Sequence, residues 1–220
     1  YPHAHQNRAQ ARFGQGRLDE AWAEHAWRWK NVRTAHKVGW RDFPQPYLER
    51  PPEAGETLLV WGEEARGEAV LFASMVPELA ERGIACVLEC APRLAPLFAR
   101  SMPGVTVVPR SDPPDPACLD AGIAAQTSCG DLGRWLRPGF SAFPERRSFL
   151  LPEPAQRDRL REKSLARGKG PVIGISWRSK HAGLTRHKST RLTDWLPILG
   201  ALEASFVNLQ YDDGTAETEQ

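Results

Sequence analysis

The sequence predicts an α/β fold, and three features of the 220-residue chain carry that prediction. From residue 57 onward, short apolar runs alternate with helical stretches, a rhythm typical of a parallel sheet with crossover helices. A second unit of the same kind begins near residue 172. Before both, apolar residues recur at helical spacing. We therefore expect a helical hairpin, a linker, a first α/β domain and the beginning of a second, at residues 1–30, 31–56, 57–168 and 169–220, respectively.

The first segment predicts two short helices joined by a glycine turn. Residues 3–13 are compatible with a helix, and Gly14 and Gly16 end it. In the helix that follows, apolar and aromatic residues share one face: Leu18, Ala21, Trp22, Ala26 and Trp29. Because a hairpin of this size buries little surface alone, such hairpins usually stack on neighbours. We therefore interpret it as the last unit of a helical array.

Prolines mark the next segment, residues 31–56, as an extended linker. In the first α/β domain, apolar runs predict strands at 57–61, 84–89 and 105–108, with a weaker fourth strand at 122–125. Helical patterns lie between them at 68–82 and 93–101. Gly83 ends the first of these helices, because glycine readily adopts the left-handed conformation after a helix C-terminus.

The second α/β unit contains fewer elements. A helix is expected at 156–165, a strand at 172–177, a long polar loop at 178–191, a helix at 192–202 and a strand at 205–210. A parallel sheet needs more strands than these to bury both faces. The chain also begins at Tyr1 without a methionine. We therefore expect the second domain to be incomplete and both ends to be cuts in a longer protein.

Composition and charge argue against several kinds of partner. With 29 basic and 27 acidic residues, the net charge is +2, so nothing indicates nucleic acid. No apolar run approaches the roughly 18 residues of a membrane helix. Four cysteines, Cys86, Cys90, Cys118 and Cys129, lack the spacing of a zinc site. We expect them to be structural thiols of a cytoplasmic protein, and we expect no metal.

The loop after the first predicted strand, residues 61–68, is the first candidate site. In open parallel sheets, ligands bind beyond the carboxyl ends of the strands. Gly67 allows close approach of backbone to a ligand, and the helix that follows offers free N–H groups. Glu68 is positioned to take a proton from a nucleophile. An acidic residue in a first helical turn is also an ordinary cap, and this alternative stays open.

The second candidate site is the loop at residues 178–191. It holds five lysines or arginines in fourteen residues, among them Arg178 and Lys188, together with hydroxyl side chains such as Ser189. Basic groups between a buried strand and a helix suit an anionic ligand such as a diphosphate. Gln210, at the end of the last strand, is also placed to reach a ligand. The alternative is a solvated basic loop.

Several motifs resemble bacterial tetratricopeptide-repeat proteins that carry a glycosyltransferase-like domain. Residues 16–29 resemble a last repeat, and Trp61-Gly-Glu followed by residues 71–79 resembles the start of that domain. The match continues in order with residues 103–105, 174–179, 188–189, 195–199 and 206–211. Nearly the whole chain is covered, although residues 109–168 match poorly.

The family looks related to ADP-heptose lipopolysaccharide heptosyltransferases and, more distantly, to O-linked GlcNAc transferases. The resemblance implies the GT-B architecture, in which a first Rossmann-like domain binds the acceptor and a second binds a nucleotide sugar. Glu68 matches the position of a proposed catalytic Asp, and Lys188, seven residues before Trp195, matches a lysine that grips the donor phosphates. No metal is implied. The acceptor is unknown, and a protein acceptor would be reached through the helical arm.

Two departures leave a second hypothesis open. The relatives usually carry a Gly-x-Gly-Asp type of loop, whereas this chain has Ala65-Arg66-Gly67-Glu68. The lost glycine favours a non-catalytic scaffold that binds other proteins. The rest of the donor domain is also missing, so we expect these 220 residues to be inactive by themselves. An NAD-dependent enzyme is disfavoured, because the three-glycine fingerprint is absent.

Overall fold

The computed structural model describes residues 1–30, 39–63, 66–145, 148–165, 170–179 and 189–210. The chain divides into two compact units, unit 1 (Tyr1–Leu151) and unit 2 (Pro152–Gln220). Lys188, one of the expected phosphate contacts, lies outside the described residues. No helix in the described ranges has both the length and the apolar character needed to cross a membrane.

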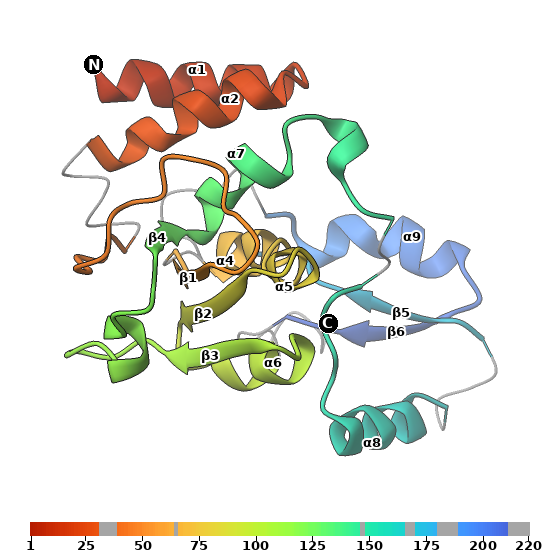
Figure 1. The fold of residues 1–220 in the computed structure, drawn as a ribbon. Coiled ribbons are helices and arrows are strands. Elements are labelled where there is room, and N and C mark those ends of the chain that lie inside the picture. The colour runs from red at the N-terminus through yellow and green to blue at the C-terminus, as the bar shows by residue number, and fades with distance from the viewer. Residues whose placement is uncertain (31–38, 64–65, 146–147, 166–169, 180–188, 211–220) are drawn as a thin grey trace. The chain divides into compact units, whose positions relative to one another are not determined.

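A four-stranded parallel sheet forms the centre of unit 1 (Figure 1). Its strands are β1 (Thr57–Trp61), β2 (Ala85–Cys90), β3 (Val105–Pro109) and β4 (Ala125–Ser128). They lie in the order β3-β2-β1-β4, and every neighbouring pair is parallel. The expected α/β class is confirmed, and this arrangement is compatible with a Rossmann-like fold.

The fourth strand lies about three residues later than the sequence predicts. We expected it at 122–125, but β4 begins at Ala125. Its other residues are polar, so their hydrophobicity gives no signal, yet all of them are buried. Hydrogen bonds compensate for this burial: the indole Nε1 of Trp61 donates to Oε1 of Gln126 at 2.7 Å.

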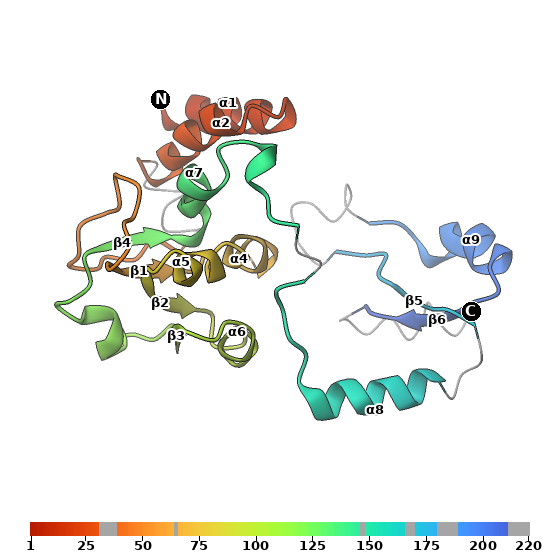
Figure 2. The ribbon, with the colours of Figure 1, turned by 45° about the vertical axis from the view of Figure 1, so that its right-hand side comes forward.

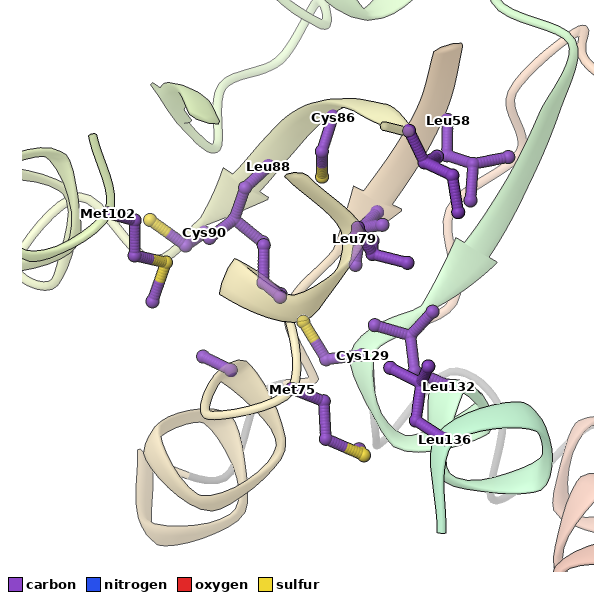
Figure 3. Packing of buried hydrophobic residues seen from close by; sticks show 14 of the residues in the cluster. Leu58, Met75, Leu79, Cys86, Leu88, Cys90, Met102, Cys129, Leu132 and Leu136 are labelled. Carbon is purple, nitrogen blue, oxygen red and sulfur yellow. The ribbon is translucent and has the colours of Figure 1, made fainter. Parts of the chain in front are cut away.

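Alternate residues of β1 point to opposite faces of the sheet, as the pleat of a strand requires. Leu58 and Val60 belong to the larger hydrophobic cluster, and Leu59 and Trp61 belong to a smaller one on the other face. Figure 3 shows the larger cluster, in which leucines, methionines and three cysteines pack together. All four cysteines are buried free thiols, and burial raises the pKa of Cys86 to about 12.

Two helices lie where the sequence predicts one helix at 68–82. Helix α4 covers Arg66–Ala73 and α5 covers Pro77–Glu81. The break precedes Pro77, since proline lacks an N–H and clashes with the preceding turn in a helix interior. The other helices of this part are α6 (Ala95–Ser101), η2 (Pro116–Leu119), η3 (Cys129–Leu132), α7 (Gly133–Leu136) and η4 (Phe140–Ala142).

A pair of antiparallel helices forms the beginning of unit 1 (Figure 2). The helices are α1 (Pro2–Gly14) and α2 (Leu18–His25), and the short helix η1 (Ala26–Lys30) continues the second. Glu24 of α2 forms ion pairs with His5, Arg8 and Arg12 of α1. One carboxylate near the end of α2 therefore binds three side chains of α1.

Residues 39–56, within the segment that the sequence assigns to a linker, cover part of the sheet. Phe43 packs in the smaller cluster with Leu59 and Trp61, on the face opposite α5 and α6. Tyr47 forms a parallel bridge with Gln126 of β4. This segment thus extends the sheet beyond β4, and its side chains Phe43 and Tyr47 pack against one face of the sheet.

Unit 2 contains a two-stranded parallel sheet of β5 (Val172–Ile175) and β6 (Ser205–Asn208). The short helix η6 (Leu192–Trp195) and helix α9 (Leu196–Ala201) connect the strands, and α8 (Pro154–Leu165) precedes them. Ile175 and Trp177 are buried, whereas Val172, Leu196 and Ile198 are largely exposed. The described side chains of α8, at positions 154–163, are all exposed.

Candidate functional site

Acidic and polar side chains gather at the carboxyl edge of the sheet in unit 1. Glu63 follows β1, Glu89 lies near the end of β2, Ser128 ends β4 and Asp131 lies in η3. All four residues are buried. This is the edge at which open α/β sheets bind their ligands. Because buried charges need partners, the chain must supply cations there.

Arg28 of η1 supplies the first cation. Its Nη1 donates to Oδ1 of Asp131 at 2.5 Å, and its Nη2 donates to Oε1 of Glu63 at 2.8 Å and to Oγ of Ser128 at 3.0 Å. Only 4% of Arg28 is exposed. We call these four residues the Arg28 network. It fastens the N-terminal helices to the ends of β1 and β4.

The second oxygen of Asp131 is also engaged. Oδ2 accepts hydrogen bonds from the indole Nε1 of Trp29 at 2.8 Å and from the hydroxyl of Tyr47 at 2.5 Å. Burial alone would raise the pKa of Asp131, but Arg28 and the Tyr47 hydroxyl hold it below its usual value. Burial, together with the nearby Asp131 charge, raises the pKa of Tyr47, so the phenol stays a donor.

A second ion network surrounds Glu89, whose side chain is fully buried. Oε1 of Glu89 pairs with Nη2 of Arg41 at 2.6 Å, and Oε2 pairs with Nε of Arg110 at 3.3 Å. Nη2 of Arg110 also donates to the carbonyl oxygen of Gly62 at 2.6 Å. The carboxylates at this edge are therefore paired with arginines of the same chain.

Sequence reasoning missed Glu63 and Asp131. Glu63 lies inside the loop that we singled out at 61–68, but Glu68 was preferred as the first-turn acid. A usable signal exists, since an acid two residues beyond an apolar strand is desolvated and requires a cation. The sequence does not say which of its many arginines that is, because Arg28 lies 35 positions before Glu63.

The structure places Gly67 and Glu68 in the first turn of α4. Glu68 was expected there, whereas Gly67 was expected in the loop before the helix. Glu68 is exposed, so its carboxylate is open to a solvent-borne ligand, and it is not a member of the Arg28 network. A Cβ atom at Gly67 would meet no atom within 4 Å. The chain itself therefore does not require a glycine at this position.

In unit 2, the structure brings together three of the residues singled out from the sequence. Nε2 of Gln210 donates to the carbonyl oxygen of Arg178 at 2.9 Å, and the amide of Arg178 donates back to Oε1 of Gln210 at 3.1 Å. Oγ of Ser189 accepts from the amide of Ser179 at 3.0 Å. The side chains of Gln210 and Ser189 thus bind the ends of the basic loop, a role that sequence reasoning did not assign to them.

A comparison with curated proteins finds Protein FlbA of Caulobacter vibrioides. The two sequences are 33% identical over an alignment of 172 residues, and the match covers 72% of this chain and 29% of that protein. The chain therefore spans less than a third of the length of this relative. No family model matches the chain. No solved structure matches it either.

An aromatic pocket of about 440 Å³ lies beside the Arg28 network in unit 1. Its lining includes Trp27, Trp29, Trp40, Tyr47, Trp135, Lys30 and Arg134. Its size is within the range of small-molecule sites. However, the Lys30 ammonium lies 4.1 Å from the ring centre of Trp27, and the Arg134 guanidinium lies 4.6 Å from that of Trp135. These two indoles therefore already pack against cations of the chain.

Within the described ranges, no cluster of three or more His, Cys, Asp or Glu side chains is placed to hold a metal ion.

His25 predicts a pH dependence of stability. Its Nε2 is buried and has no hydrogen-bond partner in the described structure. Burial, with the Arg28 charge adding to it, lowers its pKa to about 3. Because an unfolded histidine titrates near pH 6.5, unfolding takes up a proton below that pH. The contribution of neutral His25 is complete above about pH 6.5 and is lost as the pH falls toward about 3, by up to ~1.4 kcal/mol per pH unit.

Urea denaturation at several pH values between about 7.5 and 4 tests this expectation. The matched variant is His25→Phe, which keeps an aromatic ring against Phe13 and Phe72 but cannot titrate. We expect the parent to lose more stability than the variant over this interval. Parallel pH profiles for the two proteins would show that His25 is not responsible.

Proposed function

We propose that the full-length protein transfers a sugar from a nucleotide-sugar donor to an acceptor. The observation that carries the proposal is the basic loop of unit 2, whose two ends lie at the carboxyl edge of a parallel sheet. In such sheets this edge is where phosphorylated ligands bind. Five lysines and arginines between positions 178 and 191 supply positive charge that suits a diphosphate.

The proposed roles follow the chemistry of each side chain. Arg178 and Lys188 hold the donor diphosphate and stabilise it as it leaves with negative charge. Glu68, exposed in the first turn of α4, takes the proton from the acceptor hydroxyl. We propose that the N-terminal helices are a tetratricopeptide-type arm that presents a protein acceptor. No metal is needed, since the loop supplies the positive charge.

Glu68→Gln in the full-length protein tests the catalytic role. Loss of a general base lowers turnover by about 10²–10⁴-fold, and the exposed position predicts an unchanged melting temperature. The measurement is sugar release from a panel of UDP-, GDP-, ADP- and CMP-sugars. The matched control is Glu53→Gln, which removes an exposed carboxylate from the same unit and is expected to keep full activity. Equal turnover of Glu68→Gln and the parent would refute the role.

The alternative function is a non-catalytic scaffold, and the Arg28 network favours it. In unit 1 the ligand edge of the sheet is filled by a side chain of the chain itself. Isothermal titration of the full-length protein with UDP, GDP and ADP separates the two functions. A transferase is expected to show saturable binding of at least one nucleotide. No binding of any of them would favour the scaffold.

A further inference from the structure

Hydrogen bonds hold the two ends of the basic loop of unit 2 close together. We call these hydrogen-bonded ends, residues 176–179 and 189–190 together with Gln210, the neck of the loop. The parallel strands β5 and β6 end at Ile175 and Asn208, which are paired in the register of the sheet. The segments that follow the two strands therefore start side by side. The amide of Leu209 donates to the carbonyl oxygen of Ile175 at 2.9 Å, which continues the ladder by one step.

Beyond the end of β6, the side chain of Gln210 hydrogen-bonds to the backbone that follows β5. Its Oε1 accepts from the backbone amides of Arg178 at 3.1 Å and Trp177 at 3.3 Å, and from Oγ of Ser176 at 3.3 Å. Its Nε2 donates to the carbonyl oxygen of Arg178 at 2.9 Å. A primary amide offers an acceptor and a donor together, so it bonds to an extended backbone much as a neighbouring strand does.

The other end of the loop is attached to the same backbone. The amide of Thr190 donates to the carbonyl oxygen of Trp177 at 2.9 Å. Oγ of Ser189 accepts from the amide of Ser179, ten positions earlier in the chain, at 3.0 Å. The hydroxyl of Thr190 accepts from the indole of Trp195 at 2.8 Å. Both ends of the loop are thus held by hydrogen bonds that do not involve a ligand.

We infer that Gln210 is a positioning residue for anion binding at Arg178, where the basic loop begins, acting through the backbone of residues 176–178. The inference rests on the proposed function, because it takes a diphosphate as the ligand. Both functional atoms of its amide are hydrogen-bonded to residues 176–178, so Gln210 acts on the ligand through Arg178. A neck held closed before binding reduces the conformational entropy that a ligand must otherwise remove.

The identity of the side chain is part of the inference. Glutamate at this position keeps the acceptor for the two amides but cannot donate to the carbonyl oxygen of Arg178. It also adds a negative charge beside a phosphate site. Alanine removes every one of these bonds. The expected order of diphosphate affinity is therefore Gln210 above Gln210→Ala, with Gln210→Glu the weakest.

The experiment uses the full-length protein and two measurements. Titration calorimetry with UDP and with inorganic pyrophosphate gives the affinity, and hydrogen exchange gives the protection of the amides at 177–179 and 190. In Gln210→Ala we expect roughly tenfold weaker binding of both probes, faster exchange at these amides and an unchanged melting temperature. The matched control is Gln156→Ala, an exposed glutamine of α8, which should leave both measurements unchanged.

The outcomes separate this inference from the proposed function. If the parent binds neither probe, the proposed function fails and the inference fails with it. If the parent binds but Gln210→Ala binds equally well, the inference alone is overturned. Weaker binding with unchanged exchange also overturns it, because Gln210 would then contact the ligand directly. Weaker binding together with faster exchange supports it.

Discussion

Replacing Arg28 with methionine is expected to destabilise unit 1 by about 3–5 kcal/mol, since it leaves two buried carboxylates without their cation. Glu63 and Asp131 are each at most about a tenth exposed, and Arg28 bonds to both. Methionine has a similar volume, so the loss is electrostatic rather than a cavity effect. Chemical denaturation, followed by the fluorescence of the surrounding tryptophans, measures it.

The triple variant Arg28→Met/Glu63→Gln/Asp131→Asn shows whether uncompensated charge is the cause. With all three charges removed, most of the lost stability should return, because replacing a whole buried ion network is often nearly neutral. The exposed Arg134→Met serves as the arginine control and should change stability by less than ~1 kcal/mol. A loss of that small size in Arg28→Met would contradict the structure of the network.

The single variant Arg28→Met should also differ from the parent in how its stability depends on pH. In the parent, the lowered pKa of Asp131 makes a contribution to stability that is present above its unfolded value of about 3.9 and is lost as the pH falls through its folded-state pKa. Without Arg28, burial dominates and raises that pKa. The stability difference between parent and variant should therefore shrink as the pH falls toward about 4.

The sequence predicts well those strands that contain a short run of apolar residues. The apolar run at 57–61 coincides with β1, and the runs near 84–89 and 105–108 fall within one residue of β2 and β3. Strand β1 and most of β2 are buried, whereas β3 lies at the edge of the sheet and buries only Val108. Strand β4 differs, because its buried residues Gln126, Thr127 and Ser128 are polar and give no hydrophobic signal. Gln126 and Ser128 hydrogen-bond to residues far away in the sequence, Trp61 and Arg28.

The candidate site shows the same limit more sharply. The sequence places ligand binding at the strand ends and identifies Arg178, Ser189 and Gln210, which the structure brings together in unit 2. The sequence does not reveal that the side chains of Gln210 and Ser189 are already hydrogen-bonded to backbone groups. Nor does it reveal that Arg28 fills the edge of the first sheet, because pairs separated by 35 and 103 positions leave no local pattern.

Replacing Trp22 with alanine is expected to destabilise unit 1 by about 3–5 kcal/mol and to release the N-terminal helices. Trp22 is buried in α2, and its indole Nε1 donates to the carbonyl oxygen of Arg137 at 2.8 Å. Its ring also packs edge-to-face against Phe13, with 4.7 Å between the ring centres. Denaturation gives the change in stability, and limited proteolysis near residue 15 reports whether the helices have become accessible.

A pair of glycine variants tests the contact that Trp22 makes with α7, this time by changing the residue on the α7 side. A Cβ atom at Gly133 would lie well inside van der Waals contact with the indole of Trp22, whereas one at Gly14 would meet no atom within 4 Å. Neither glycine has a positive φ. Gly133→Ala should therefore lose about 1–3 kcal/mol by overpacking. Gly14→Ala, also at a helical position, should be neutral or slightly stabilising.

The comparison is decisive because both variants make the same chemical change and differ only in what the new methyl group meets. A large loss in Gly133→Ala alone would show that the N-terminal helices and the sheet fold as one cooperative unit, joined by Trp22 and by Arg28. Equal stability of the two variants would mean that the helices separate from the sheet in solution. In that case the Arg28 network would open as well, and Glu63 and Asp131 would become available to an external cation.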